Sequence, residues 1–373
     1  NHTISMSGGT DKLQFYGSFG YYDNPGVMEN SGYQRYHALS NISANLTPWL
    51  KLGFNMSGFY GTADPGSPAG AFTWGYATTP AMIFKHDGKF GGMQDSSDDI
   101  SESTNNVLMS LHSGRGDNIT RNGKYRIFAT VTPIKDFSVT GSMIYEYTNN
   151  NTKSIPVFHD TWNFGTNQIV YSTKGQTYIS QSTYREQRNY MDLVAHYNHR
   201  FLEEHLGLGL MAGTSQEKYT YENESITRMD LVKNDLSVIN GANGAFNGSG
   251  NKAVWAMRSY FGRINLDWDN KYLLEADLRS DGSSRFASGK RWGWFPSASA
   301  AWRISQEDFM KDSGIDNLKL RASYGSLGNN SVGNYASVST YGTQNYVINS
   351  AVATGLAITS LANSNLTWEK TKV

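Results

Sequence analysis

Hydrophobic and polar residues alternate along most of the chain, most regularly between residues 263 and 304. Apolar side chains occupy every second position on both sides of a tight turn at 269–271, and again after a Gly- and Ser-rich loop. Because successive side chains of a β-strand point to opposite faces, this period predicts strands with one apolar and one polar face. The tight turn between two such stretches predicts that neighbouring strands are antiparallel.

Two classes of β-protein share this alternation. A soluble sandwich or barrel buries its apolar face and exposes its polar face to water. A membrane barrel turns its apolar face to lipid and lines a wet interior with polar side chains. Alternation alone favours the soluble class, because soluble antiparallel sheets are far commoner. The choice therefore depends on the turns, the loops and the aromatic residues.

The connections between strands fall into two groups by length. The alternation predicts about thirteen antiparallel strands, joined at one end by short turns at 8–11, 47–49, 133–136, 198–204 and 269–271. The connections at the other end are long and polar, at 23–32, 61–123, 148–187, 219–254, 280–294 and 326–365. Short periplasmic turns and long extracellular loops are typical of outer-membrane barrels. At the short-turn end, Ser305 and Asp308 predict a capping box that opens a brief helix within 305–317.

Aromatic residues near the short turns favour the membrane class. A membrane barrel places such rings at the boundary between lipid and water, and the candidates for this position are Trp49, Trp268, Tyr272 and Trp302. The sequence therefore predicts an all-β, antiparallel transmembrane β-barrel whose apolar residues face lipid. The charged residues of the polar face are then predicted to face the lumen: Glu275, Asp277, Arg279, Arg303, Lys319 and Arg321.

Composition agrees with a thin apolar band. The 373 residues include 23 Tyr, 17 Phe and 9 Trp, yet hydrophobic residues make up only 38% of the chain. The 32 basic and 32 acidic residues balance, which gives no reason to expect a nucleic-acid partner. The chain has no Cys and hence no disulfide framework. No apolar run approaches the roughly 18 residues of a membrane helix, so any membrane crossing must use strands.

No arrangement of residues in the sequence indicates catalysis or a cofactor. His196 and His199 have a spacing that suggests a metal pair, but on a strand they point to opposite faces, whereas metal ligands converge. No His is recognisably paired with a nucleophile and an orienting acid. Glu275 and Asp277 lie beside Arg279, which favours a charge-balanced wall over acid–base catalysis. We therefore expect neither an enzyme nor a bound metal or cofactor.

Two of the long loops contain aromatic residues set among Gly, Asn and Thr. These are the candidate substrate-binding residues, namely Phe72, Trp74, Tyr76, Trp162 and Phe164. Aromatic rings and amides bind sugars by stacking and directed hydrogen bonds, and peptides use the same residue types. The alternative is that these rings pack the loops together or against a partner. In loop 280–294, a basic rim of Arg285, Lys290 and Arg291 suits an acidic partner or lipopolysaccharide.

Five stretches of the sequence carry recognisable motifs. Three lie in the second half of the chain, namely YLLEADLRSDGSSRFASGKRWGWFPSASAAWRISQEDFM (272–310), LKLRASYGSLGNN (318–330) and NSNLTWEKT (363–371). The other two are the opening ISMSGGTDKLQFYGSFGYYDNPGV (4–27) and YQRYHALSNISANLTPWLKLGFNMSG (33–58). Together they resemble the SusC/RagA family of TonB-dependent outer-membrane transporters of Bacteroidetes-type bacteria, and the two early stretches are similar to that family's early barrel.

The resemblance implies a fold and a function beyond what alternation predicts. Members have barrels of twenty-two strands, filled by an amino-terminal plug and covered outside by a SusD-like surface lipoprotein. TonB reaches the plug and energises import. Residues 1–373 would then be a partial TonB-dependent receptor barrel, with the plug and the last strands outside it.

The function that the resemblance implies is active import of a bulky nutrient, either a glycan or a peptide, across the cell outer membrane. The expected partners are the lipoprotein, TonB acting through the plug, outer-membrane lipid or lipopolysaccharide, and the cargo. The alternative is a non-transporting SusC-like scaffold or binding subunit of a larger outer-membrane complex.

Overall fold

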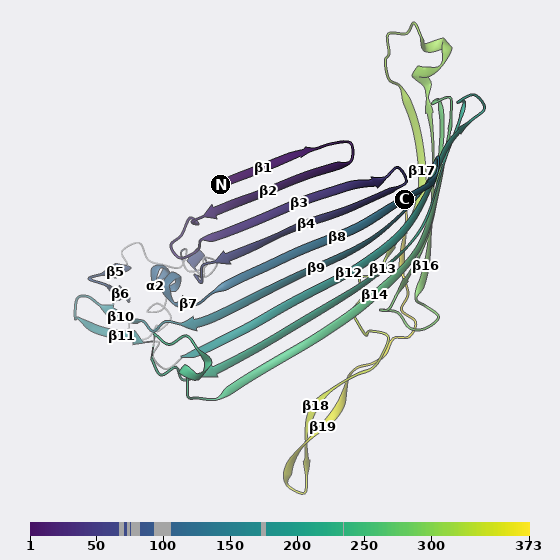
Figure 1. Ribbon diagram of the computed structural model, residues 1–373. Helices are drawn as coiled ribbons and strands as arrows, with labels where there is room; N and C mark the ends of the chain where they lie inside the picture. The colour runs from purple at the N-terminus through teal and green to yellow at the C-terminus, as the bar shows by residue number, and fades with distance from the viewer. Residues whose placement is uncertain (67–70, 73–74, 76–82, 93–105, 173–176, 234) are drawn as a thin grey trace.

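A single curved sheet of fourteen strands dominates the computed structural model, which describes residues 1–66, 71–72, 75, 83–92, 106–172, 177–233 and 235–373 (Figure 1). Thirteen strands follow one another in chain order, each antiparallel to the next: β1 (His2–Gly9), β2 (Leu13–Asn24), β3 (Tyr33–Thr47), β4 (Leu50–Ala63), β8 (Asn118–Ile134), β9 (Phe137–Pro156), β12 (Tyr178–Phe201), β13 (Leu206–Met229), β14 (Phe246–Trp268), β15 (Tyr272–Ser283), β16 (Trp292–Arg303), β17 (Lys319–Asn329) and β20 (Glu369–Lys372). The short β7 (Gly114–Arg115) pairs with β9 beside this path. The predicted all-β antiparallel fold is confirmed.

The smaller elements gather mainly at the loop end of the sheet (Figure 1). A four-stranded sheet contains β5 (Lys85–His86), β6 (Lys89–Gly91), β10 (Asp160–Asn163) and β11 (Gln168–Ser172). The other elements are the helix α2 (Val107–His112), the 3₁₀ turn η2 (Ile239–Gly241), and the hairpin of β18 (Thr340–Ile348) and β19 (Ala351–Ser360). None of the helices in the described ranges is long and apolar enough to cross a membrane.

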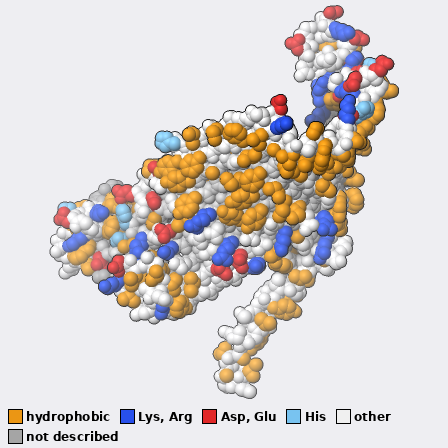
Figure 2. All heavy atoms as spheres, viewed as in Figure 1, with side chains coloured by type: hydrophobic (Ala, Val, Ile, Leu, Met, Phe, Trp, Pro, Cys, Tyr) orange, Lys and Arg blue, Asp and Glu red, His pale blue; other side chains and the backbone are white. Residues whose placement is uncertain are grey.

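The strand register aligns the apolar positions of neighbouring strands on one face. Across β15 and β16, Tyr272 pairs with Trp302 and Leu274 with Ala300, while Glu275 on the other face pairs with Ser299. The apolar face carries no second layer in the part of the chain that the structure describes. Its large side chains stay exposed, as Leu274 does at 48%, and Figure 2 shows hydrophobic side chains gathered across it with charged ones mainly around its margins. A soluble sandwich would bury these residues, so the bare apolar face favours the membrane class.

The predicted short turns all lie at one end of the sheet, away from the small elements (Figure 1). In the turn between β14 and β15, Asp269 and Asn270 have φ of 51° and 56°. Asn and Asp tolerate this left-handed conformation better than other residues that carry a Cβ. The residue types of the turn therefore agree with its backbone.

Several strands extend well into segments that the sequence predicted as loops. β12 and β13 each have 24 residues and occupy parts of the predicted loops 148–187 and 219–254. A strand needs only about 9–11 residues to cross a bilayer, so these strands extend beyond it. The predicted boundaries were wrong because polar residues there were interpreted as loop, although a strand in water needs no apolar face to keep its hydrogen bonds.

The brief helix predicted within 305–317 is replaced by two 3₁₀ turns, η3 (Ile304–Gln306) and η4 (Asp308–Met310). Neither turn has a side-chain cap, so Ser305 and Asp308 do not form a capping box. Glu307, between the two turns, is held instead by side chains of the β15–β16 hairpin.

Candidate functional site

The predicted lumen-facing carboxylates of β15 are neutralised by arginines on the same polar face. Arg263 Nε donates to Asp277 Oδ1 at 2.6 Å, and Arg263 Nη1 lies 3.6 Å from Glu275 Oε2. Asp277 also accepts from Ser297 Oγ at 3.3 Å. Arg279 Nε donates to Asp281 at 2.8 Å. These contacts form the charge-balanced wall that the sequence favoured over acid–base chemistry.

The same face continues as a polar wall across strands that the sequence analysis left without candidate residues. Lys124 Nζ lies 3.8 Å from Glu146 Oε2 on the next strand, and Arg188 Nε lies 2.9 Å from Glu217 Oε1. Further examples are the pairs Ser142–Asp192 at 2.6 Å and Asn55–Asn41 at 2.7 Å. Apart from Arg188 and Glu217, each of these residues lies one position away from a member of an apolar row, and that alternation was the available signal.

The other three predicted lumen residues form a cationic corner at the turn end. Arg303 pairs directly with Lys319 across β16 and β17, and Arg321 is opposite Ala301. None of the three forms an ion pair within the described ranges. Like charges directly opposite each other on a sheet destabilise it. This corner therefore favours an acidic group supplied from outside these strands.

The four predicted interface aromatics all lie at the turn end. Trp268 pairs with Tyr272, and the Tyr272 and Trp302 rings stack with centroids 6.5 Å apart on the apolar face. Trp49 lies in the turn between β3 and β4 and is 51% exposed. Their contact with the lipid–water boundary stays a prediction.

A second group of aromatic residues, missed by the sequence analysis, lies at the opposite end of the apolar face. Tyr260 stacks on Trp292 with centroids 5.7 Å apart, and Trp294 follows on the same face of β16. The ten residue-to-residue steps from Trp292 to Trp302, at about 3.3 Å each and with a tilt of about 40°, span roughly 25 Å of height. That height matches the apolar band of an outer-membrane barrel. Trp292 and Trp294 were missed because 280–294 was predicted to be a loop.

Glu307 ties the two turn-end aromatics together. Its carboxylate accepts from Tyr272 Oη at 2.7 Å, from Trp302 Nε1 at 3.0 Å and from Lys271 Nζ at 3.3 Å. The hydrogen bond from Tyr272, followed by that from Trp302, holds the pKa of Glu307 below its ordinary value of 4.5. The sequence did not indicate this contact, because Tyr272 precedes Glu307 by 35 positions.

The lowered pKa of Glu307 makes its stabilising contribution depend on pH. A depressed folded-state pKa gives stability that is present above the unfolded value and lost as pH falls through the folded value. We expect Glu307→Gln to lower thermal stability at pH 7 and to matter progressively less below about pH 4.5. Melting curves of the wild type and Glu307→Gln from pH 7 to pH 3 measure the difference in melting temperature between them. A difference that stays constant or widens on acidification would contradict a stabilising role of the Glu307 carboxylate.

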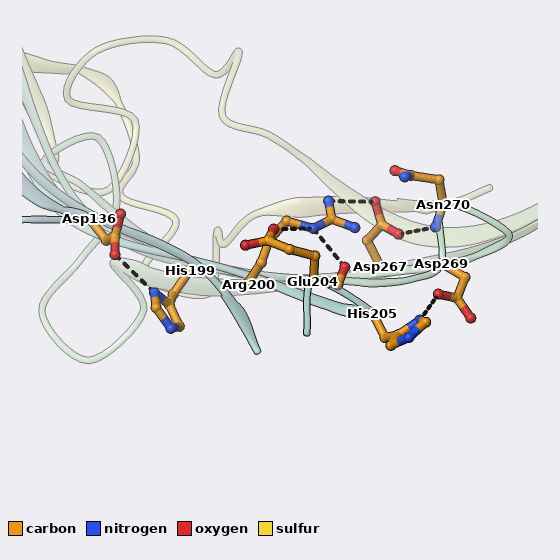
Figure 3. A network of polar contacts seen from close by, with 8 residues as sticks. All are labelled: Asp136, His199, Arg200, Glu204, His205, Asp267, Asp269 and Asn270. Atoms are coloured by element: carbon orange, nitrogen blue, oxygen red, sulfur yellow. Dashed lines mark hydrogen bonds and ion pairs between the residues drawn. The ribbon is translucent and has the colours of Figure 1, made fainter. Parts of the chain in front are cut away.

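A polar network at the turn end joins three neighbouring hairpins (Figure 3). His199 Nδ1 lies 2.9 Å from Asp136 Oδ2, and His205 contacts Asp269. Arg200 adds contacts with Glu204 and Asp267, and the Asn270 amide donates to Asp267 at 2.7 Å. His199 therefore serves to join turns, and His196 lies on the other face of the strand.

The predicted substrate-binding residues divide into three groups. Trp74 and Tyr76 lie outside the described residues, and Phe72 is 67% exposed. Trp162 and Phe164 are partly buried beside the four-stranded sheet. Lys89 Nζ lies 3.7 Å from the centroid of the Trp162 ring, and Phe164 meets His86 edge-on. These contacts support the alternative of loop packing, and contact with a ligand stays a prediction.

The residues of the basic rim have separate environments. Arg285 donates to the Asn334 side chain and to the Asn330 carbonyl, each at 2.9 Å, and its guanidinium lies over Trp255. Arg291 donates to the Phe286 carbonyl at 3.2 Å. Lys290 is exposed.

Comparison with known proteins identifies a family. The family "TonB dependent receptor-like, beta-barrel" matches residues 74–372. "TonB-dependent receptor P39" of Formosa agariphila is 28% identical over 374 residues, covering 99% of this chain and 34% of that protein. "TonB-dependent receptor SusC" of Bacteroides thetaiotaomicron is 25% identical over 407 residues, covering 100% of this chain and 38% of that protein.

Solved structures give the same fold. The structure titled "Structure of the RagAB peptide transporter" superposes with a TM-score of 0.83 at 24% identity, covering 99% of this chain and 41% of that one. The chain spans about a third of the length of the curated relatives it matches. The family match over most of the chain, with the antiparallel wall described above, shows that the chain belongs to the TonB dependent receptor-like β-barrel family of the outer membrane, as a SusC-like receptor.

Proposed function

We propose that the chain forms part of the wall of an outer-membrane importer for a bulky nutrient, an oligosaccharide or an oligopeptide. The observation that carries this proposal is the polar face of the sheet, where ion pairs and amide contacts continue from β3 to β16. A polar, charge-balanced face opposite an apolar one suits a wet passage inside a lipid-facing wall. The rest of the barrel would complete the enclosure.

The same proposal includes a SusD-like surface lipoprotein and energy supplied by TonB through a plug. Similarity to SusC supports it, and so does the fold shared with the RagAB peptide importer. The cationic corner of Arg303, Lys319 and Arg321 faces the interior, and an acidic surface of the plug would balance it.

Uptake measurements in the source bacterium test the function. Cells that lack the full-length protein should lose growth on one class of bulky nutrient, tested with oligosaccharides and oligopeptides of defined size. Uptake should also stop when TonB is removed. Unchanged uptake of every cargo class, together with loss of an outer-membrane assembly, would favour the alternative of a non-transporting scaffold.

Charge reversal at Asp277 tests whether the charge of the polar face affects cargo uptake or only supports the sheet. Asp277→Lys places a cation beside Arg263 and removes their 2.6 Å contact. We expect the barrel to assemble normally, because the pair is partly solvated and such pairs contribute about 1 kcal/mol or less. Cargo uptake should fall severalfold because the charge of the passage changes.

Outer-membrane abundance and uptake per assembled protein measure the two effects of Asp277→Lys separately. Asp312→Lys, at an exposed carboxylate of the turn end, is the control and should change neither. Normal uptake by assembled Asp277→Lys protein would argue against a passage along this face.

A further inference from the structure

An outward-facing pocket of about 290 Å³ lies at the end of the apolar face that is nearest the long loops. Its walls come from the four neighbouring strands β13 to β16 and from the loop after β15, and they include Gln216, Arg258, Gly282, Ser284, Arg291 and Trp292. Trp292 belongs to the second aromatic group and stacks on Tyr260. The pocket therefore lies where the apolar band ends and the head groups of the outer leaflet begin.

The pocket is cationic and lacks a carboxylate. Arg258 Nη2 donates to Gln216 Oε1 at 2.9 Å, and Arg291 Nε donates to the Phe286 carbonyl at 3.2 Å. Within the described ranges neither arginine forms an ion pair. Lys218, exposed and also without an ion pair there, is directly opposite Ala256 of the pocket wall. Two arginines thus line the pocket, and Lys218 lies opposite one residue of its wall.

Neighbouring cations nearer the long loops, in contrast, have acidic partners. Arg185 lies 3.6 Å from Glu222 and 3.4 Å from Glu224, and Lys252 lies 3.7 Å from Glu222. These two cations thus have acidic partners on the outward face, whereas no carboxylate of the described residues forms an ion pair with Arg258 or Arg291. This contrast indicates that the counter-charge of the pocket comes from a ligand and not from the chain.

The shape and donors of the pocket suit a phosphate. Gly282 makes room for the Trp292 ring that forms one wall, because a Cβ at that position would lie 2.9 Å from the ring. Ser284 Oγ accepts from the Ala256 amide at 2.8 Å, which leaves its hydroxyl hydrogen available to donate. Guanidinium groups bind phosphate oxygens in a bidentate manner. Below the pocket, the apolar face offers Ile264, Leu278 and Pro296 to acyl chains.

We propose that this pocket binds the phosphate of a phosphorylated glycolipid of the outer leaflet, with Arg258 and Arg291 as the principal ligands and Lys218 beside them. Charge complementarity and position support this occupant, because an anion joined to acyl chains satisfies both the cations and the apolar face below them. The proposal depends on the outward orientation of the apolar face and is independent of cargo and energy source.

Lipid retention by the full-length protein tests the proposal. The protein is purified from its outer membrane, and binding of diphosphorylated lipid A and of its dephosphorylated form is measured by native mass spectrometry and in phosphatidylethanolamine vesicles. We expect the Arg258→Gln/Arg291→Gln double variant to bind the phosphorylated form about tenfold or more weakly. Arg185→Gln is the matched control, since that outward arginine already has acidic partners, and it should bind within about twofold of the wild type.

Three other results would contradict binding of a phosphorylated glycolipid at this pocket. Equal retention of the dephosphorylated lipid, or unchanged retention by an assembled double variant, would overturn it. Displacement of the lipid by millimolar inorganic phosphate would show a free-anion site instead. Assembly is checked by heat-modifiable gel migration. If the double variant does not assemble, Arg258→Gln alone serves, because its one polar partner among the described residues is Gln216, and it should still weaken binding severalfold.

Discussion

Leu278→Arg is expected to destabilise the assembled barrel by ~2–4 kcal/mol, the cost of a cation on the lipid face near the bilayer midplane. Leu278 is 47% exposed on the apolar face, and its direct neighbours Gly262 and Pro296 offer no counter-charge. Along β15 it lies between Tyr272 of the turn-end aromatics and Gly282 beside the second group. Denaturant titration of the full-length protein in phospholipid vesicles measures the loss.

The same substitution on the opposite face provides the control for Leu278→Arg. Ser299 lies on the polar face, directly opposite Glu275. An arginine there gains a carboxylate neighbour and water, so Ser299→Arg should cost less than about 1 kcal/mol. If Ser299→Arg were the costly change and Leu278→Arg harmless, the polar face would be the one against lipid.

The alternation of residues predicted the antiparallel strands and their short turns because both depend on local sequence. The period of two fixes which side chains share a face, and the turn residues fix where the chain reverses. The Glu275 and Leu274 rows are therefore where the sequence placed them. Strand length was not predictable in this way, since β12 and β13 extend beyond the expected membrane region with polar side chains on both faces.

Contacts between distant parts of the sequence account for most of what was missed. Glu307 holds Tyr272 and Trp302 through hydrogen bonds that follow from the path of the chain after β16. The pocket at Arg258 needs the register of β13, β14 and β15, together with the conformation of the following loop. The sequence singled out Arg291 as part of a basic rim but gave no reason to join it to Arg258.

Trp162→Ala tests whether the aromatic loops meet cargo. If the ring is an anchor for cargo, its loss should weaken cargo binding by ~2 kcal/mol or more, about thirtyfold. Barrel assembly and heat stability should stay nearly unchanged, because β10 belongs to the small four-stranded sheet and not to the wall. Binding of the imported cargo and association with the lipoprotein are measured separately on the full-length protein.

Lys89→Ala is the matched variant for Trp162→Ala, because Lys89 Nζ lies 3.7 Å from the centroid of the Trp162 ring and also donates to Asn167 Oδ1 at 3.2 Å. If the ring stacks on cargo, removing Lys89 uncovers one face of the indole, and binding should be kept or strengthened. If the ring only packs the loop, both variants should loosen the same contact and have equal effects. Lost lipoprotein association with intact cargo binding would make this surface a partner interface, because an anchor for cargo cannot be removed without weakening cargo binding.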